Sequence, residues 1–166
     1  PAVSCGEENL LGLPGDPYAE ENILIHEFAH ALHQMALIQL DNSFQNQIEE
    51  CFKNSIDHNI WEGTYASTNV NEYWAEGVQS WFNTNRENDR DHAWINTREE
   101  LKKADPQLAN LIEKTLGNSE WRYQLPRNRN PQTPHLNGFQ SNNETPFSWP
   151  KDLVKWFADY ESGKIG

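Results

Sequence analysis

Two histidines and a glutamate in the stretch LIHEFAHAL, at positions 24–32, have types and spacing that could hold a metal ion. His26 and His30 are four residues apart, so on an α-helix they project from one face and can share one ion. Zinc takes neutral imidazole nitrogens at about 2 Å, and its catalytic sites combine three protein ligands with one open position. Glu27 points about 100° away around the helix axis, where it can act as a general base on water. The alternative is a buried helix whose histidines hydrogen-bond to the backbone, and the motif alone does not decide between the two.

The residues around this motif favour the metal. A helical pattern runs from about position 19 to 39. The neighbours of the histidines are apolar on almost every side of it: Ile23, Leu24, Ile25, Phe28, Ala29, Ala31 and Leu32. We therefore expect the two histidines and Glu27 to lie inside the protein, where unpaired polar groups are costly and a metal would satisfy them. We expect His33 to line a groove or support the ligands from behind, because the motif already supplies two histidine ligands.

The third ligand must come from another part of the chain, and its type separates the classes of zinc peptidase. A metzincin would have glycine at position 33 and histidine at position 36, where this chain has His33 and Ala36. The stretch NEYWAEG instead places Glu72 and Glu76 four residues apart, opposite an apolar stripe that includes Trp74. One glutamate can bind zinc while the other orients a histidine from behind. Without the histidine motif, the pair would be interpreted as a solvated helix face.

The combination of HEFAH with TYASTNVNEYWAE, over about residues 20–83, resembles the gluzincin metallopeptidases, a family that includes the anthrax lethal factor catalytic domain and the clostridial Pro-Pro endopeptidases. In that family a Tyr-Ala pair precedes a helix of the form Glu-aromatic-aromatic-Ala-Glu, whose first glutamate binds zinc. The resemblance implies Zn2+ as the cofactor and peptide-bond hydrolysis as the activity. It assigns six roles: His26, His30 and Glu72 as zinc ligands, Glu27 as the general base, Glu76 as support behind the ligands and Tyr65 as the catalytic hydroxyl.

The resemblance and the helical patterns predict an α+β fold that is predominantly α. A zincin-like arrangement is expected, with the HExxH helix at its centre and a second helix that carries the glutamates. The enzymes of that family have a sheet before the histidine helix, but only about 25 residues precede it here, so we expect little or no N-terminal sheet. The edge strand that would position a substrate is either compressed into about residues 3–11 or absent.

Further helical segments are indicated by periodicity and by capping residues. They are a helix over 43–56, one that begins at the capping box TREE at 97–100, one from Asp105 and Pro106 to Gly117, and a last one over 151–161. Residues 125–150 are rich in proline, asparagine and glutamine, which predicts a long coil. Residues 1–166 show no repeat and no domain boundary, and are interpreted as a single catalytic domain. Because the chain begins at Pro1 without a leader, it is expected to be a mature or truncated form.

Charge and composition exclude several classes of partner. A formal net charge of -12 and a pI near 4.8, with no cluster of lysine and arginine, argue against nucleic acid and anionic membranes. No run of 18 apolar residues could span a membrane. We expect a monomer whose partner is a peptide or protein substrate. A disulfide between Cys5 and Cys51 is predicted, and together with the sequon at Asn143 it favours a secreted, extracellular protein.

These features together predict a zinc-dependent endopeptidase. Glu27 would take a proton from the attacking water and pass it to the leaving amine, while Tyr65 would stabilise the oxyanion or position the substrate. Two alternatives stay open: a zinc-dependent amide hydrolase that acts on a non-peptide substrate, and a non-catalytic zinc-binding or interaction protein. Glu27 argues against the second, because zinc ligation alone does not need it. Tyr65 could also be a packing residue, which is the common role of a partly buried tyrosine.

Overall fold

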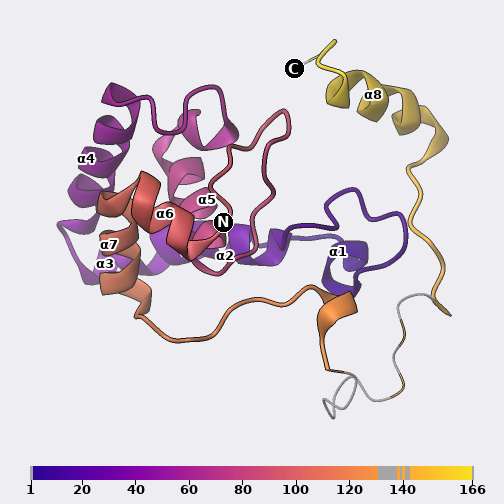
Figure 1. The fold of residues 1–166 in the computed structure, drawn as a ribbon, viewed down its shortest axis with the longest axis horizontal. Helices are drawn as coiled ribbons and strands as arrows, with labels where there is room; N and C mark the ends of the chain where they lie inside the picture. The colour runs from indigo at the N-terminus through magenta and orange to yellow at the C-terminus, as the bar shows by residue number, and fades with distance from the viewer. Residues whose placement is uncertain (1, 131–137, 139, 141–142, 166) are drawn as a thin grey trace.

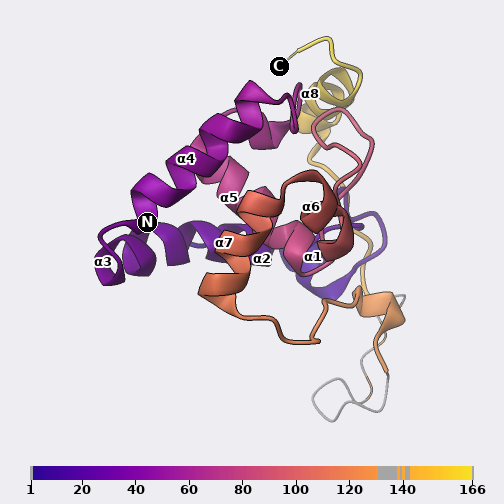
Figure 2. The ribbon, with the colours of Figure 1, turned by 60° about the vertical axis from the view of Figure 1, so that its left-hand side comes forward.

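The computed structural model describes residues 2–130, 138, 140 and 143–165, and its body is built around one buried helix. This helix, α5 (Val70–Trp81), is buried at every residue from Tyr73 to Trp81. Four helices pack around α5 (Figures 1 and 2): α2 (Ile23–Leu32), α4 (Phe44–Asp57), α6 (Arg98–Ala104) and α7 (Pro106–Leu116). The tryptophan stripe of α5 is core, as the sequence predicts, since Trp74 and Trp81 are fully buried.

The predicted helices are confirmed, and their ends follow the capping residues. Thr97 and Glu100 form the expected capping box at the start of α6. Asp105 accepts the backbone N–H of Leu108 at the start of α7, which ends at Gly117 with a positive φ of 78°. The start of α2 differs from the predicted position 19. The Asn22 side chain accepts the N–H of Ile25 at 2.9 Å, which caps the helix, so that it begins at Ile23.

Helix α2 continues beyond its formal end as one rod. A π-helical turn, η1 (His33–Leu37), and the short α3 (Ile38–Leu40) follow without a break. The apolar side expected for this rod is only partly correct, because Leu24, Phe28 and Met35 are exposed while Ala29 is buried. The rod turns its histidine side towards α5, so the polar groups face inward and a strip of apolar side chains faces solvent.

The prediction of a predominantly helical fold is confirmed, but the β part of the expected α+β fold is not found in the described residues. No strand occurs in them, and the stretch considered for an edge strand contains a helix, α1 (Glu7–Leu11). The physical reason is the buried side chain of Asn9. Its amide N–H group donates to the carbonyls of Tyr18 and Glu21, and its Oδ1 accepts the N–H of Ile23. This folds the N-terminal segment back on itself and leaves it no neighbouring strand.

The crossing of α5 and α7 is close because Gly77 has no side chain. A Cβ built there would lie 2.5 Å from Cδ2 of Leu108 and 3.2 Å from Cδ1 of Ile112, both fully buried. Asp105 locks the same region from the polar side. Its Oδ2 accepts hydrogen bonds from the Trp61 indole N–H at 3.1 Å and from the Tyr73 hydroxyl at 2.6 Å. Such a fully satisfied buried carboxylate holds α5 and α7 at a fixed distance.

The predicted disulfide between Cys5 and Cys51 is wrong, because both cysteines are free thiols. Cys51 is buried in α4 and lines a groove with Leu111 of α7, and burial raises its pKa to about 11. Cys5 lies before α1, where burial and the charges of Glu27 and Glu8 raise its pKa. The two residues therefore belong to different neighbourhoods of the molecule, which an even cysteine count does not reveal.

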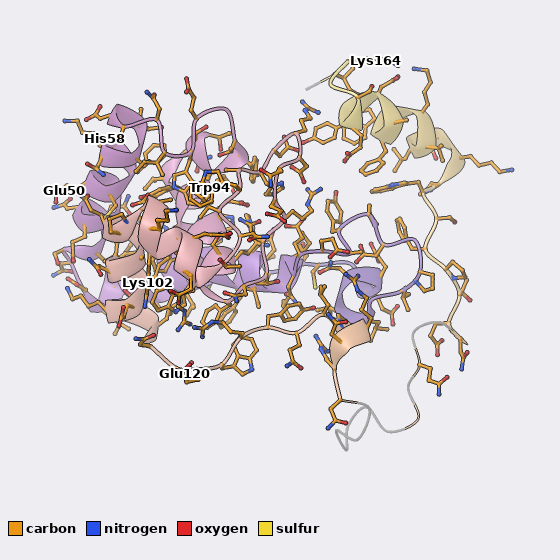
Figure 3. All side chains as sticks on the ribbon, viewed as in Figure 1. Glu50, His58, Trp94, Lys102, Glu120 and Lys164 are labelled. Atoms are coloured by element: carbon orange, nitrogen blue, oxygen red, sulfur yellow. The ribbon has the colours of Figure 1, made fainter. Side chains whose placement is uncertain are left out.

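The C-terminal part leaves the body as an extended arm. The chain passes through a single turn, η3 (Pro126–Asn128), and ends in α8 (Lys151–Glu161), the predicted last helix (Figure 1). Figure 3 shows Lys164, just after α8, at the top of the view, while Glu50 of α4 lies at its left-hand end. The coil predicted over 125–150 lies partly outside the described residues. Within the described ranges, no helix is long and apolar enough to cross a membrane.

Candidate metal centre and cleft

Three donor atoms from α2 and α5 converge on one point. Nε2 of His26 lies 3.1 Å from Nε2 of His30 and 3.1 Å from Oε2 of Glu72, and the third side of this triangle is 3.2 Å. Ligand atoms about 2 Å from a tetrahedral ion lie about 3.3 Å from one another, so the triangle has the size of one face of a zinc tetrahedron. Among the described residues, this is the group of histidine, cysteine and carboxylate side chains that could hold a metal ion.

The orientation of His26 is fixed by Gln79, a residue one turn beyond Glu76 on α5. Oε1 of Gln79 lies 2.8 Å from Nδ1 of His26. The amide nitrogen of Gln79 donates to Oε2 of Glu21 at 3.1 Å, with two backbone carbonyls at 3.4 Å, so Oε1 is the atom that must face the histidine. In its neutral form His26 therefore carries its proton on Nδ1 and directs the lone pair of Nε2 into the triangle. This is the tautomer that a metal ligand needs.

Charges in the triangle fit a bound cation. Burial lowers the pKa of His26, but hydrogen bonds to Glu72 and Glu76 outweigh this effect and raise the pKa to about 10. Burial alone would raise the pKa of Glu72, yet its hydrogen bonds to the two histidines lower the pKa to about 2. Side-chain exposures of 12% for His26, 18% for His30 and 17% for Glu72 keep most water away. A metal ion at this position would replace the proton that the pair otherwise holds.

Glu76 lies behind the triangle, as expected for a residue that supports the ligands. Its Oε1 is 3.3 Å from Nδ1 of His26, and its Oε2 accepts a hydrogen bond from Asn85 at 2.8 Å. The same Oε2 lies 3.8 Å from Nε2 of His92, whose Nδ1 is 2.7 Å from a carboxylate oxygen of Asp89. Because Glu76 is buried, the alternative of a solvated helix face is wrong for this residue. His26 is thus held by two acceptors on its Nδ1 side.

Local structure explains why Glu72 reaches the histidines. The Asn69 side chain caps α5 by accepting the N–H groups of Asn71 and Glu72, which places Glu72 in the first turn of the helix. Helix α5 is tied to α2 by the indole of Trp74, which donates to the carbonyl of Ala29 at 3.0 Å. Ala29 lies between His26 and His30 in the sequence. The bond therefore holds the histidine face of α2 next to the helix that carries Glu72.

Glu27 and Tyr65 both line a cleft next to the triangle. The cleft has a volume of about 360 Å³ and is bounded by the N-terminal segment, the start of α2 and the loop between α5 and α6. No other described residue forms a hydrogen bond or ion pair with the Glu27 carboxylate, so it stands free to act on a ligand.

Tyr65 is the first residue of a short 3-10 turn, η2 (Tyr65–Ser67), in the predicted loop before α5. Its ring is stacked on His26 with centroids 6.2 Å apart, and its backbone N–H donates to the carbonyl of Asp91 at 2.7 Å. Burial and the nearby negative charge of Glu72 raise the pKa of Tyr65 to about 12. Tyr65 is 41% exposed, whereas a residue with only a packing role would be buried. Its exposure therefore argues against the packing alternative.

His33 is not part of the triangle. It is buried against Phe44 and Trp74, and its Nε2 lies 2.9 Å from Oε1 of Gln45. The expectation that it does not bind the metal agrees with this geometry, although its place is the core rather than a groove.

Three residues behind the triangle were missed by the sequence analysis: Gln79, Asn85 and His92. A signal existed for Gln79, because it follows Glu72 by seven residues and Glu76 by three, and so lies on the same helix face. No local signal pointed to Asn85 or His92, since they come from the loop after α5 and reach Glu76 only through tertiary folding.

Comparisons with known proteins identify no relative of this chain. No family model matches it, no curated protein matches its sequence, and no solved structure matches its fold.

Proposed function

We propose that the protein is a zinc-dependent endopeptidase of the gluzincin type, with a zincin-like arrangement of α2 and α5. The observation that carries this proposal is the triangle of His26 Nε2, His30 Nε2 and Glu72 Oε2, with sides of 3.1 to 3.2 Å. Two imidazole nitrogens and one carboxylate oxygen are a donor set typical of catalytic zinc, which keeps a fourth position open. The tautomer that Gln79 imposes on His26 supports the same assignment.

Zinc held by these residues would supply a Lewis acid that polarises a carbonyl group and lowers the pKa of water. Side chains of the protein would carry out the proton transfers. The Glu27 carboxylate would accept the proton of the attacking water and pass it to the leaving nitrogen. The Tyr65 hydroxyl, which stays protonated at neutral pH because its pKa is about 12, would donate to the oxygen that gains negative charge.

Two features favour hydrolysis of peptides over the alternatives. A non-catalytic zinc protein has no need of a carboxylate in the cleft beside the ligands, where Glu27 lies. The cleft also extends from Glu27 and Tyr65 to Tyr18 and Tyr160, and about 360 Å³ accommodates several residues of an extended chain better than one small amide.

The decisive experiment combines metal analysis with digestion of an unbiased peptide library. Wild-type protein is expected to contain about one zinc per chain and to cleave peptides, and both properties should disappear on chelation and return with added zinc. Glu27→Gln should keep the zinc and lose about 10²- to 10⁴-fold in rate, the usual contribution of a general base. Glu62→Gln, an exposed glutamate outside the cleft, is the matched control and should cleave like wild type.

Each alternative gives a different result in this experiment. Wild-type protein that binds no zinc at the His26 and His30 pair would overturn the proposal. Zinc binding with equal rates for wild type and Glu27→Gln would point to the non-catalytic role. Cleavage of small amides without cleavage of any peptide would favour the amide hydrolase.

We further propose that the protein is secreted and monomeric. Since both cysteines are free, the sequon at Asn143 is the remaining argument for a secreted protein, and Asn143 is exposed. A glycan on Asn143, detected by mass spectrometry of protein expressed through a secretory pathway, would support it. Light scattering should find the mass of one chain, 19.3 kDa.

A further inference from the structure

The C-terminal arm, residues 143–165, docks on the body at two separate places. The first is the turn at positions 14–15. The N–H of Phe147 donates to the carbonyl of Pro14 at 2.8 Å. Gly15 has a φ of +89°, and a Cβ built there would lie 2.5 Å from the carbonyl oxygen of Phe147. Only glycine allows this close approach of two backbones, so the GLPGDPY stretch is shaped to receive the arm.

The second docking place is the loop between α5 and α6, where Tyr160 of α8 is held by three contacts. Its hydroxyl donates to Oδ2 of Asp91 at 3.0 Å, and its backbone carbonyl accepts a hydrogen bond from Arg90 at 2.6 Å. The guanidinium of Arg90 also stacks over the Tyr160 ring at 4.1 Å from the centroid. Figures 1 and 2 both show α8 beside this loop, and in Figure 1 it lies away from the other labelled helices.

The two docking places lie on different walls of the cleft. The turn at 14–15 continues into Tyr18, which lines the cleft from the N-terminal segment, while Asp91 lines it from the loop after α5. Tyr160 lines the cleft together with them. Asp91 also connects the arm to the reactive end, because its backbone carbonyl accepts the N–H of Tyr65 and its carboxylate accepts the hydroxyl of Tyr160.

The rest of α8 contributes little to the body. Leu153, Val154 and Trp156 are exposed, so the helix is not a missing piece of the core. Among the described residues of α8, Tyr160 is the one that lines the cleft. Tyr160 stacks on Trp156 of the same helix, with ring centroids 5.4 Å apart, and it brings α8 to the cleft, so it is placed to contact what enters the cleft.

We propose that Tyr160 is a substrate-contacting residue and that the C-terminal arm forms one wall of the substrate cleft. This proposal rests on the proposed function, because Tyr160 would contact the part of a peptide substrate that lies beyond the bond to be cleaved. Tyr160 would contact a peptide side chain or backbone with the part of its side chain that lines the cleft.

Two probes that bind zinc distinguish a contact with Tyr160 from binding at the metal itself. Acetohydroxamate is small enough to reach only the metal, whereas a tripeptide hydroxamate also extends along the cleft. Tyr160→Ala is expected to weaken the tripeptide hydroxamate by about tenfold, the effect of one lost aromatic contact, and to leave acetohydroxamate unchanged. Tyr160→Phe, which keeps the ring, should restore most of the affinity. Val154→Ala, an exposed residue of the same helix, is the matched control and should bind both probes like wild type.

The outcomes distinguish this proposal from the proposed function. Failure of acetohydroxamate to bind wild-type protein supplied with zinc would overturn the metal function and this proposal with it. Normal acetohydroxamate binding with equal tripeptide affinity in wild type and Tyr160→Ala would overturn the wall alone. Equal weakening of both probes in Tyr160→Ala would also overturn it, because the residue would then act through the metal site or the fold.

Discussion

Helices α5 and α2 both supply atoms to the candidate metal centre, but the protein holds them in different ways. Every residue of α5 from Tyr73 to Trp81 is buried, and packing on all sides fixes its backbone. In α2 only Ala29 is buried, while Leu24 and Phe28 face solvent. Glu72, the carboxylate of the triangle, therefore lies in the first turn of the buried central helix, and the two histidines lie on a helix with one face at the surface.

This difference teaches how chemistry and stability are divided between the two helices. Buried residues behind α5, such as Gln79 and Glu76, orient His26 without touching a substrate. Glu27 of α2 lines the cleft and is available to one. We therefore expect substitutions in α5 to change stability and metal affinity, and substitutions on the outer side of α2 to leave both unchanged.

The largest expected effect separates two glutamates of the same helix. Glu72→Gln should reduce zinc affinity by more than about 100-fold, the upper range for residues behind the ligands, because it removes an ionised donor from the triangle. Glu76→Gln should reduce it by about 10- to 100-fold and leave zinc bound at millimolar protein concentration. Competition titration with a zinc chelator measures both. A reversed order would make Glu76 the ligand.

Tyr65→Phe should affect turnover rather than binding. A donor that meets charge only in the transition state typically contributes about 10²- to 10³-fold, and we expect a loss of at least about tenfold in kcat with little change in KM. The zinc content and the melting temperature should stay close to wild type, because the ring remains stacked on His26. Steady-state kinetics on the best library peptide tests this. Wild-type kcat in a stable, zinc-loaded variant would return Tyr65 to a packing role.

Gln79→Leu should reduce zinc affinity by about 10- to 100-fold, since the His26 ring would lose the acceptor that fixes its tautomer. The change also leaves a carboxylate oxygen of Glu21 without its amide donor, so some loss of stability is expected. Gln45→Leu is a matched control, because Gln45 holds His33, which lies outside the triangle. Equal zinc affinity in the two variants would show that Glu76 alone is enough to orient His26.

The sequence predicted the parts of this site that depend on local geometry. His26 and His30 share a face because of their spacing on one helix, and Glu72 and Glu76 share a face of a second helix for the same reason. The three atoms converge only because α2 crosses α5 at a particular position along its axis. That position depends on the hydrogen bond from the Trp74 indole to the Ala29 carbonyl, which no local sequence pattern predicts.

The failures of the sequence analysis have the same origin. A disulfide depends on the distance between two cysteines in the folded chain, and Cys5 and Cys51 are in different neighbourhoods. An apolar run on α2 was interpreted as burial on all sides, but helix periodicity does not say which face meets the core when histidines can form that face. The strand considered near positions 3–11 was displaced by the hydrogen bonds of Asn9.

Gly77→Ala tests the packing of α5 and should destabilise the protein. Alanine is favoured over glycine in a helix by about 1 kcal/mol, but the new Cβ would overlap Leu108, and overpacking a core typically costs about 1–3 kcal/mol. A net loss of about 1 kcal/mol lowers the melting temperature of a chain of this size by about 2–4 °C. Thermal unfolding of chelated protein measures it without the contribution of the metal. A higher melting temperature would show that Leu108 can move aside.

The smallest effect is expected on the outer side of α2. Phe28 is 54% exposed, so Phe28→Ser should change the free energy of unfolding by less than about 0.5 kcal/mol and leave zinc binding unchanged. Phe44→Ser is the buried counterpart. Phe44 packs edge-on against Trp74 and is buried, so its loss should cost about 3–5 kcal/mol, the usual cost of truncating a core phenylalanine. Denaturant unfolding of the two variants, read side by side, measures the contrast directly. If Phe28→Ser also unfolded far more easily than wild type, the outer side of α2 would be covered in solution, and the division of labour between the two helices would not hold.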